Sequence, residues 1–249
     1  MPSDKWFLST AVAPGRLRMF CFSYAGGGPA SYSSWQTALG SEIEVLSANL
    51  PGRGKRLHEP PVTSLSELVG ILANHIDFSD ARPFVFFGHS LGGLVAFELA
   101  RFCKAHDLPG PSALFVSGCN PPQQRTIVRP LHLMNDDDLV RELREYGGTS
   151  HELLENRELM LLVSPAIRAD FSLAANFEYR PDALLEIPII VLGGDADPGV
   201  DPLTLPIWQK ETISECRVRL YGGEHFFILS NSREILSDIR ADILRIELI

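Results

Sequence analysis

A serine flanked by glycines, set between an apolar run and an amphipathic segment, limits most strongly what this chain can fold into. Residues 84–93 read FVFFGHSLGG, so Ser90 stands in a Gly-x-Ser-x-Gly pattern. The run 84–87 is typical of a buried strand, and 91–106 carries apolar residues at helical spacing. A sharp strand-to-helix turn leaves no room for side chains two positions before and after the serine, where Gly88 and Gly92 stand. The pattern predicts a nucleophilic serine, although a glycine-rich turn with a merely capping serine would read the same way.

The other apolar runs predict a mostly parallel sheet. They are short, rich in β-branched and aromatic residues, and several are continuous rather than alternating, which is typical of strands buried on both faces. Amphipathic segments between and after them predict helices on both sides of the sheet, which is the doubly wound α/β pattern. The expected strands span residues 17–24, 43–50, 84–87, 113–117, 187–192 and 216–221, and the expected helices 64–78, 91–106 and 232–245.

Residues 120–184 break this alternation, because they hold helix-like pieces without a clear strand. One piece, 136–146, follows the capping residue Asn135 and ends at two glycines. Another starts near Glu152, and Pro165 interrupts or starts a third. We expect a helical lid inserted over the site, with apolar residues such as Leu139 and Leu143 shaping access. A bundle that merely covers one face of the sheet is the alternative.

A serine hydroxyl needs a base, and His225 is the candidate among seven histidines. It follows the last predicted strand, where a nucleophile–acid–histidine order requires the base, and two preceding glycines let the chain bend back. The orienting acid should follow the strand 187–192. Asp197 is preferred because Pro198 fixes its backbone, whereas Asp195 is suited to a turn and Asp201 is a distant third.

An oxyanion formed at Ser90 needs backbone N–H donors, and the sequence offers two. The Leu91 N–H follows the nucleophile, and the glycine-rich loop 24–28 after the first strand can supply the Ala25 N–H. A phosphate loop is less suitable because no Walker lysine follows, and a plain turn stays possible. The loops 24–28, 88–92, 193–198 and 222–227 all follow the carboxyl ends of predicted strands, where open α/β sheets place their sites. Together they predict one domain over residues 1–249 with the α/β-hydrolase fold and a lid at about 120–184.

Composition narrows the class of partner. A formal charge of −9 argues against nucleic acid, which is bound mainly through clustered Lys and Arg. Apolar stretches stop well short of the roughly 20 residues that span a bilayer, and the first 13 residues do not resemble a signal peptide. The four cysteines lie far apart without a C-x-x-C pair, which indicates neither a metal site nor a disulfide framework and suits a reducing cytoplasm. We also expect a monomer with no cofactor and no membrane partner.

The motifs taken together resemble type II thioesterases, the stand-alone editing hydrolases of nonribosomal peptide and polyketide synthases. The resemblance runs from about residue 18 to 227, in the order and spacing of that family. One departure is Ser23, where the family usually has proline, and it bears only on the shape of the loop. The matching segments are residues 20–28, 50–56, 88–93, 194–198 and 223–227.

The resemblance implies an acyl or aminoacyl thioester substrate, carried on the phosphopantetheine arm of an acyl or peptidyl carrier protein. Ser90, Asp197 and His225 would be the catalytic residues, without a cofactor. Arg53, Lys55 and Arg56 form the densest basic cluster near a motif and are candidates for carrier contact, unless Arg53 braces its own turn. A carboxylesterase or lipase, a cyclising thioesterase, and a ligand-binding relative without catalysis stay open as alternatives.

Overall fold

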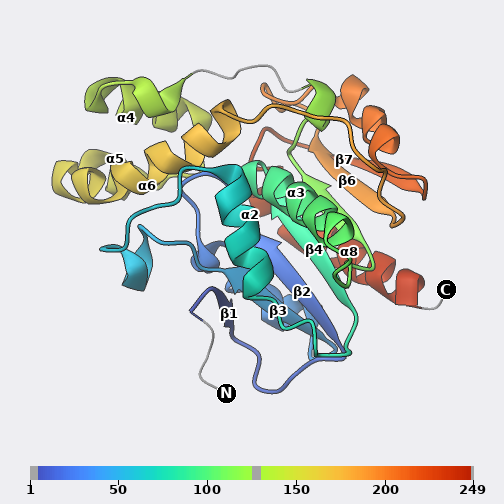
Figure 1. Cartoon of the computed structure of the whole chain (residues 1–249). Helices are drawn as coiled ribbons and strands as arrows, with labels where there is room; N and C mark the ends of the chain where they lie inside the picture. The colour runs from blue at the N-terminus through green and yellow to red at the C-terminus, as the bar shows by residue number, and fades with distance from the viewer. Residues whose placement is uncertain (1–4, 125–129, 248–249) are drawn as a thin grey trace.

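Seven strands form one twisted sheet in the computed structural model, which describes residues 5–124 and 130–247 (Figure 1). The strand order is β1-β3-β2-β4-β5-β6-β7, and every neighbouring pair is parallel except β1 with β3. This confirms the mostly parallel α/β sheet predicted from the sequence. The strands are β1 Phe7–Ser9, β2 Leu17–Phe22, β3 Ile43–Ala48, β4 Phe84–His89, β5 Leu114–Ser117, β6 Ile189–Gly194 and β7 Cys216–Tyr221.

The central strands are buried on both faces, which explains why they read as continuous apolar runs. In β4, Phe84 and Phe86 face one apolar core, whereas Val85 and Phe87 face the other. The first core packs against α2 (Leu65–Asn74) and α3 (Leu91–Ala105). The second packs against α1 (Trp35–Leu39) and α8 (Ser232–Glu247).

Several short elements are not predicted by the sequence. The edge strand β1 has three residues and is held by antiparallel pairing with β3, while α1 has five residues and buries Trp35 and Leu39. Neither is long enough to show a period in the sequence. A further short helix, α7 (Phe227–Ser230), precedes α8. None of the helices in the described ranges is both long and apolar enough to cross a bilayer.

Among the described residues between β5 and β6, three α-helices sit apart from the sheet (Figure 1). They are α4 (Asp136–Tyr146), α5 (His151–Glu155) and α6 (Arg157–Ala175), and we call them the helical insertion. They share a small apolar core of their own. Asn135 caps α4 and Gly147 ends it, as predicted, but α6 runs unbroken through Pro165 and so corrects the expected interruption.

The turn between β4 and α3 is built on two close backbone approaches. A Cβ atom at Gly88 would lie 1.9 Å from the carbonyl oxygen of Gly92, and a Cβ at Gly92 would lie 1.9 Å from that of Phe22. Neither contact can be relieved by a flexible side chain, because both partners are backbone atoms. The two glycines therefore fix how α3 leaves the sheet.

We expect Gly92→Ala to lower the free energy of unfolding by about 3 kcal/mol or more, because backbone would have to move. Gly70 inside α2 is the matched control, since a Cβ there meets nothing within 4 Å. Gly70→Ala should raise stability by about 0.5–1 kcal/mol through helix propensity. Urea unfolding measures both, and equal midpoints for Gly92→Ala and the parent would contradict the packing argument.

Candidate active site

Ser90 lies at the turn between β4 and α3 in a strained backbone conformation. Its φ of 57° and ψ of −116° are unusual for a residue with a Cβ. Its N–H donates to the Ser117 carbonyl at 2.8 Å, which ties the turn to β5. The side chain is thus presented at the carboxyl edge of the sheet, above the first turn of α3.

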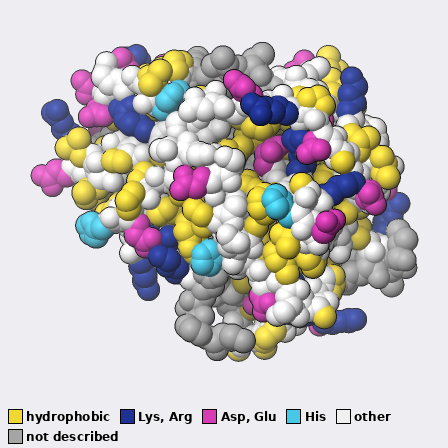
Figure 2. Space-filling model, in the orientation of Figure 1, with side chains coloured by type: hydrophobic (Ala, Val, Ile, Leu, Met, Phe, Trp, Pro, Cys, Tyr) yellow, Lys and Arg dark blue, Asp and Glu magenta, His cyan; other side chains and the backbone are white. Residues whose placement is uncertain are grey.

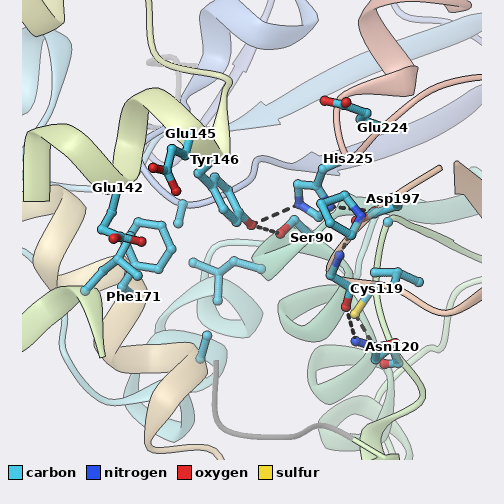
Figure 3. A pocket seen from close by; sticks show the side chains of 18 residues that line it. Ser90, Cys119, Asn120, Glu142, Glu145, Tyr146, Phe171, Asp197, Glu224 and His225 are labelled. Atoms are coloured by element: carbon cyan, nitrogen blue, oxygen red, sulfur yellow. Dashed lines mark hydrogen bonds and ion pairs between the residues drawn. The ribbon is translucent and has the colours of Figure 1, made fainter. Parts of the chain in front are cut away.

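His225 and Asp197 form a buried pair beside this serine (Figure 3). The Nδ1 atom of His225 lies 2.7 Å from Oδ2 of Asp197, and the Asp197 side chain is fully buried. Its other oxygen accepts the Gly199 N–H at 2.8 Å, so the carboxylate is held from both sides. This pairing turns Nε2 of the imidazole away from the carboxylate and toward the cavity that Ser90 also lines.

The competing residues at this edge are engaged elsewhere. Asp195 accepts the Gly223 N–H at 2.9 Å and so ties the acid loop to the histidine loop, rather than closing a turn of its own. His89 has Nδ1 2.9 Å from the Ser117 hydroxyl and is fully buried. Burial, and next the neighbouring His225, hold the pKa of His89 well below its usual range. His89 is therefore a neutral, packed imidazole that contacts β5.

Tyr146 places its hydroxyl between the nucleophile and the histidine, which the sequence did not indicate. The hydroxyl oxygen lies 3.1 Å from Ser90 Oγ and 2.9 Å from His225 Nε2, as the dashed lines of Figure 3 show. Tyr146 is the last residue of α4, and its ring packs on Phe171 and Phe226. The helical insertion thus reaches Ser90 and His225, and this hydroxyl bridges the two side chains.

The glycine-rich loop after β2 also reaches the cavity beside Ser90. Ala25 and Leu91 both line the cavity beside the serine. The next two N–H groups of the loop are engaged, since Gly26 donates to Asp170 at 2.8 Å and Gly27 donates to the Tyr24 carbonyl at 2.9 Å. This placement supports Ala25 as the loop's oxyanion donor.

The cavity beside Ser90 measures about 360 Å³ and has a mainly apolar wall. Leu139 and Leu143, which we expected to shape access, instead lie in the core of the helical insertion. Carboxylates of α4, Glu142 and Glu145, also reach the cavity (Figure 3). Its apolar lining comes from Leu91, Leu131, Phe171, Ala174 and Val200.

Within the described parts of the chain, His, Cys, Asp and Glu side chains do not gather in a group that could hold a metal ion. The site consists instead of a strained serine, a histidine paired with a buried carboxylate, and an apolar cavity with backbone donors at its edge. This combination suits acyl transfer. The family model for the thioesterase domain matches residues 17–243. The chain belongs to the thioesterase family.

Individual relatives agree with this assignment over nearly the whole chain. The gramicidin S biosynthesis protein GrsT of Aneurinibacillus migulanus is 39% identical, covering 94% of this chain and 91% of that protein. Thioesterase PikA5 of Streptomyces venezuelae is 34% identical, covering 97% and 86%. Among solved structures, the type II thioesterase BorB of the borrelidin cluster superposes with a TM-score of 0.88 at 33% identity, covering 96% and 98%. The predicted resemblance and the α/β-hydrolase fold are confirmed.

The basic cluster after β3 is largely internal in this thioesterase. Arg56 is only 5% exposed; it donates to Glu59 and to the Asn49 carbonyl, and lies over the Trp6 ring. Hydrogen bonding to Arg56 lowers the pKa of Glu59 to about 2. Buried and paired in this way, the Arg56 side chain leaves little surface for a carrier, which argues against the contact expected of it. Arg53 braces the site from within by pairing with Asp170. Lys55 is the exposed cation of the three.

We expect Tyr146→Phe to speed labelling of Ser90 by a fluorophosphonate by about two- to tenfold, because freeing Ser90 Oγ from this hydroxyl breaks one hydrogen bond, which contributes about 0.5–1.5 kcal/mol. The ring contacts to Phe171 and Phe226 stay in place. Tyr179→Phe is the matched control, since that hydroxyl bonds Glu211 away from the cavity. Slower labelling in Tyr146→Phe alone would mean that the hydroxyl assists Ser90 rather than blocking it.

Proposed function

We propose that this thioesterase hydrolyses acyl or aminoacyl thioesters on the phosphopantetheine arm of carrier proteins in nonribosomal peptide or polyketide biosynthesis. The observation that carries the proposal is the Asp197–His225 pair beside the strained Ser90, in a chain that aligns over nearly its full length with stand-alone thioesterases. The type II thioesterase resemblance implies an editing role, which removes stalled or incorrect acyl groups.

In the first half of the reaction, Ser90 Oγ attacks the thioester carbonyl while His225 Nε2 accepts its proton. The Tyr146 hydroxyl must first leave its place between these two atoms. Asp197 stabilises the imidazolium, and the Leu91 and Ala25 N–H groups bind the oxyanion. The tetrahedral intermediate then collapses, the carbon–sulfur bond breaks, and the pantetheine thiolate takes the proton from His225.

The second half repeats this chemistry with water in place of serine. His225 removes a proton from water, the hydroxide attacks the acyl-enzyme carbonyl, and Ser90 Oγ leaves with the proton returned by the imidazolium. The apolar wall formed by Leu131 and Phe171 holds the acyl chain during both steps. All proton transfers use side chains of this chain and water.

The carrier partner sets an electrostatic problem, because carrier proteins are usually acidic and this chain has a formal charge of −9. On the face seen in Figure 2, basic and acidic side chains are interspersed. Local contacts must therefore guide docking, and Lys55 is exposed in the loop that leaves the carboxyl end of β3. We propose further that the enzyme is a monomer and acts in the cytoplasm.

The function is tested by comparing one acyl group as a carrier-bound thioester and as an oxygen ester. We expect faster hydrolysis of the thioester, and loss of both activities in Ser90→Ala. Asp197→Asn should lower kcat by about a thousandfold or more, because the imidazole loses its orienting acceptor. Asp195→Asn is the matched control and should change kcat far less. Preference for the oxygen ester would favour a carboxylesterase, and a deficit centred on Asp195 would move the acid role there.

For the carrier contact, we expect Lys55→Glu to lower kcat/KM for the acyl-carrier substrate and to weaken its dependence on salt. A short uncharged thioester should react as before. Lys210→Glu is the matched control, because it makes the same charge change on an exposed side chain at the opposite edge of the sheet. Lys210 lies near Thr212, whose hydroxyl donates to the Leu185 and Ile187 carbonyls just before β6 begins. Equal losses in the two variants would remove Lys55 from carrier recognition.

A further inference from the structure

Asp170 is a buried carboxylate close to the site that the proposed chemistry does not use. It lies on α6 of the helical insertion and is 2% exposed. Its Oδ1 accepts Arg53 Nη2 at 2.7 Å, and its Oδ2 accepts Arg53 Nη1 and the Gly26 N–H, each at 2.8 Å. A buried carboxylate requires such partners, since an unpaired charge in the interior is costly. One of its partners belongs to the loop that carries Ala25.

The hydrogen bond from Gly26 fixes the central peptide of a tight turn. Gly27 donates to the Tyr24 carbonyl at 2.9 Å, and Gly26 has a φ of +78°. A turn with a positive φ at its third residue differs from the commonest turn by rotation of the peptide between its second and third residues. Here that peptide joins Ala25 to Gly26, and Asp170 accepts its N–H through a charge-assisted bond.

Arg53 holds the same turn from its carbonyl side. Its Nη1 also donates to the Gly27 carbonyl at 2.7 Å, so one guanidinium contacts both Asp170 and the loop. The Arg53 side chain is only 13% exposed. The bidentate geometry suits a planar guanidinium, and a lysine could not make all of these contacts at once.

The turn held in this way lies at the edge of the cavity beside Ser90. Ala25 precedes Gly26 and lines the cavity with Ser90 and Leu91. Helix α6 also supplies Phe171, the residue after Asp170, to the cavity wall. The same helix thus lines the space proposed for the acyl chain through Phe171 and holds the loop beside Ser90 through Asp170.

We propose that the Arg53–Asp170 pair positions the oxyanion loop, holding from the helical insertion the turn in which the Ala25 N–H lies. Both are positioning residues, because neither contacts the reacting atoms. The inference rests on the proposed function for the oxyanion role of Ala25. Preorganised donors stabilise the transition state more than the bound substrate, so loss of the pair should lower kcat and leave KM nearly unchanged.

The test uses Asp170→Asn, with Asp242→Asn as the matched control. Asp242 is equally buried, at 2%, and is paired with Arg217 and Arg219, but it lies on α8 and outside the cavity lining. Both variants break a buried ion pair, and thermal unfolding measures that shared structural effect. Rates are measured with an acetyl thioester of N-acetylcysteamine and with p-nitrophenyl acetate, and affinity with an alkylboronic acid that forms a tetrahedral adduct on serine.

We expect Asp170→Asn to lower kcat about tenfold or more on both substrates, with KM changed less than about threefold and boronic acid affinity falling in parallel with kcat/KM. Asp242→Asn should lower the melting temperature while keeping kcat and boronic acid affinity. Arg53→Lys, which keeps the charge beside Asp170, should lose less kcat than Asp170→Asn and serves if the latter fails to fold.

Normal kcat and boronic acid affinity in a folded Asp170→Asn would overturn the inference, as would equal losses in Asp242→Asn. If Asp170→Asn does not fold, unchanged values in Arg53→Lys overturn it. Failure of the proposed function gives a different pattern, in which the unmodified enzyme cleaves p-nitrophenyl acetate but not the thioester. The comparison of variants then continues on the oxygen ester.

Discussion

The close approach of the α3 N-terminus to the ends of β2 and β4 is the constraint on which the rest of the site depends. Gly92 packs against the Phe22 carbonyl, and Gly88 packs against Gly92. Since Phe22 ends β2, the loop carrying Ala25 must leave the sheet right beside Ser90. One packing requirement therefore brings together the nucleophile, the first turn of α3 and the oxyanion loop.

Much of the sheet and of the site was predictable because the signals are local. Buried strands require apolar residues on both faces. The side chains of β4 point alternately into the two apolar cores, so its sequence is an unbroken apolar run. Ser90, Asp197 and His225 stand in the turns and loops that follow β4, β6 and β7, and the topology of a parallel sheet brings those strand ends to one edge. Asp197 could be preferred over Asp195 because Pro198 restricts its backbone, and the pairing with His225 agrees.

What could not be predicted depends on how distant segments face one another. Tyr146 reads as the last residue of an ordinary amphipathic helix, and only the placement of α4 over the sheet edge brings its hydroxyl to Ser90. Arg56 reads as a surface charge, yet Trp6 and Glu59 bury it. Pro165 lies within α6, where local rules favour a break and tertiary packing overrides them. These outcomes are set by long-range contacts that periodicity does not encode.

The helical insertion holds the site through two helices with different kinds of attachment. Tyr146 ends α4 and is followed by Gly147 and Gly148, both with positive φ, so the aromatic side chain stands at the boundary of a helix and a glycine turn. Helix α6 instead carries the buried Asp170, and moving it would separate an ion pair and release the Gly26 N–H. Breaking a buried pair costs about 3–5 kcal/mol, whereas each hydrogen bond from the Tyr146 hydroxyl to Ser90 or His225 contributes about 0.5–1.5 kcal/mol. The contacts of the Tyr146 hydroxyl are therefore weaker than the ion pair that ties α6 to the loop of Ala25, so displacing the hydroxyl alone does not require release of the Gly26 N–H.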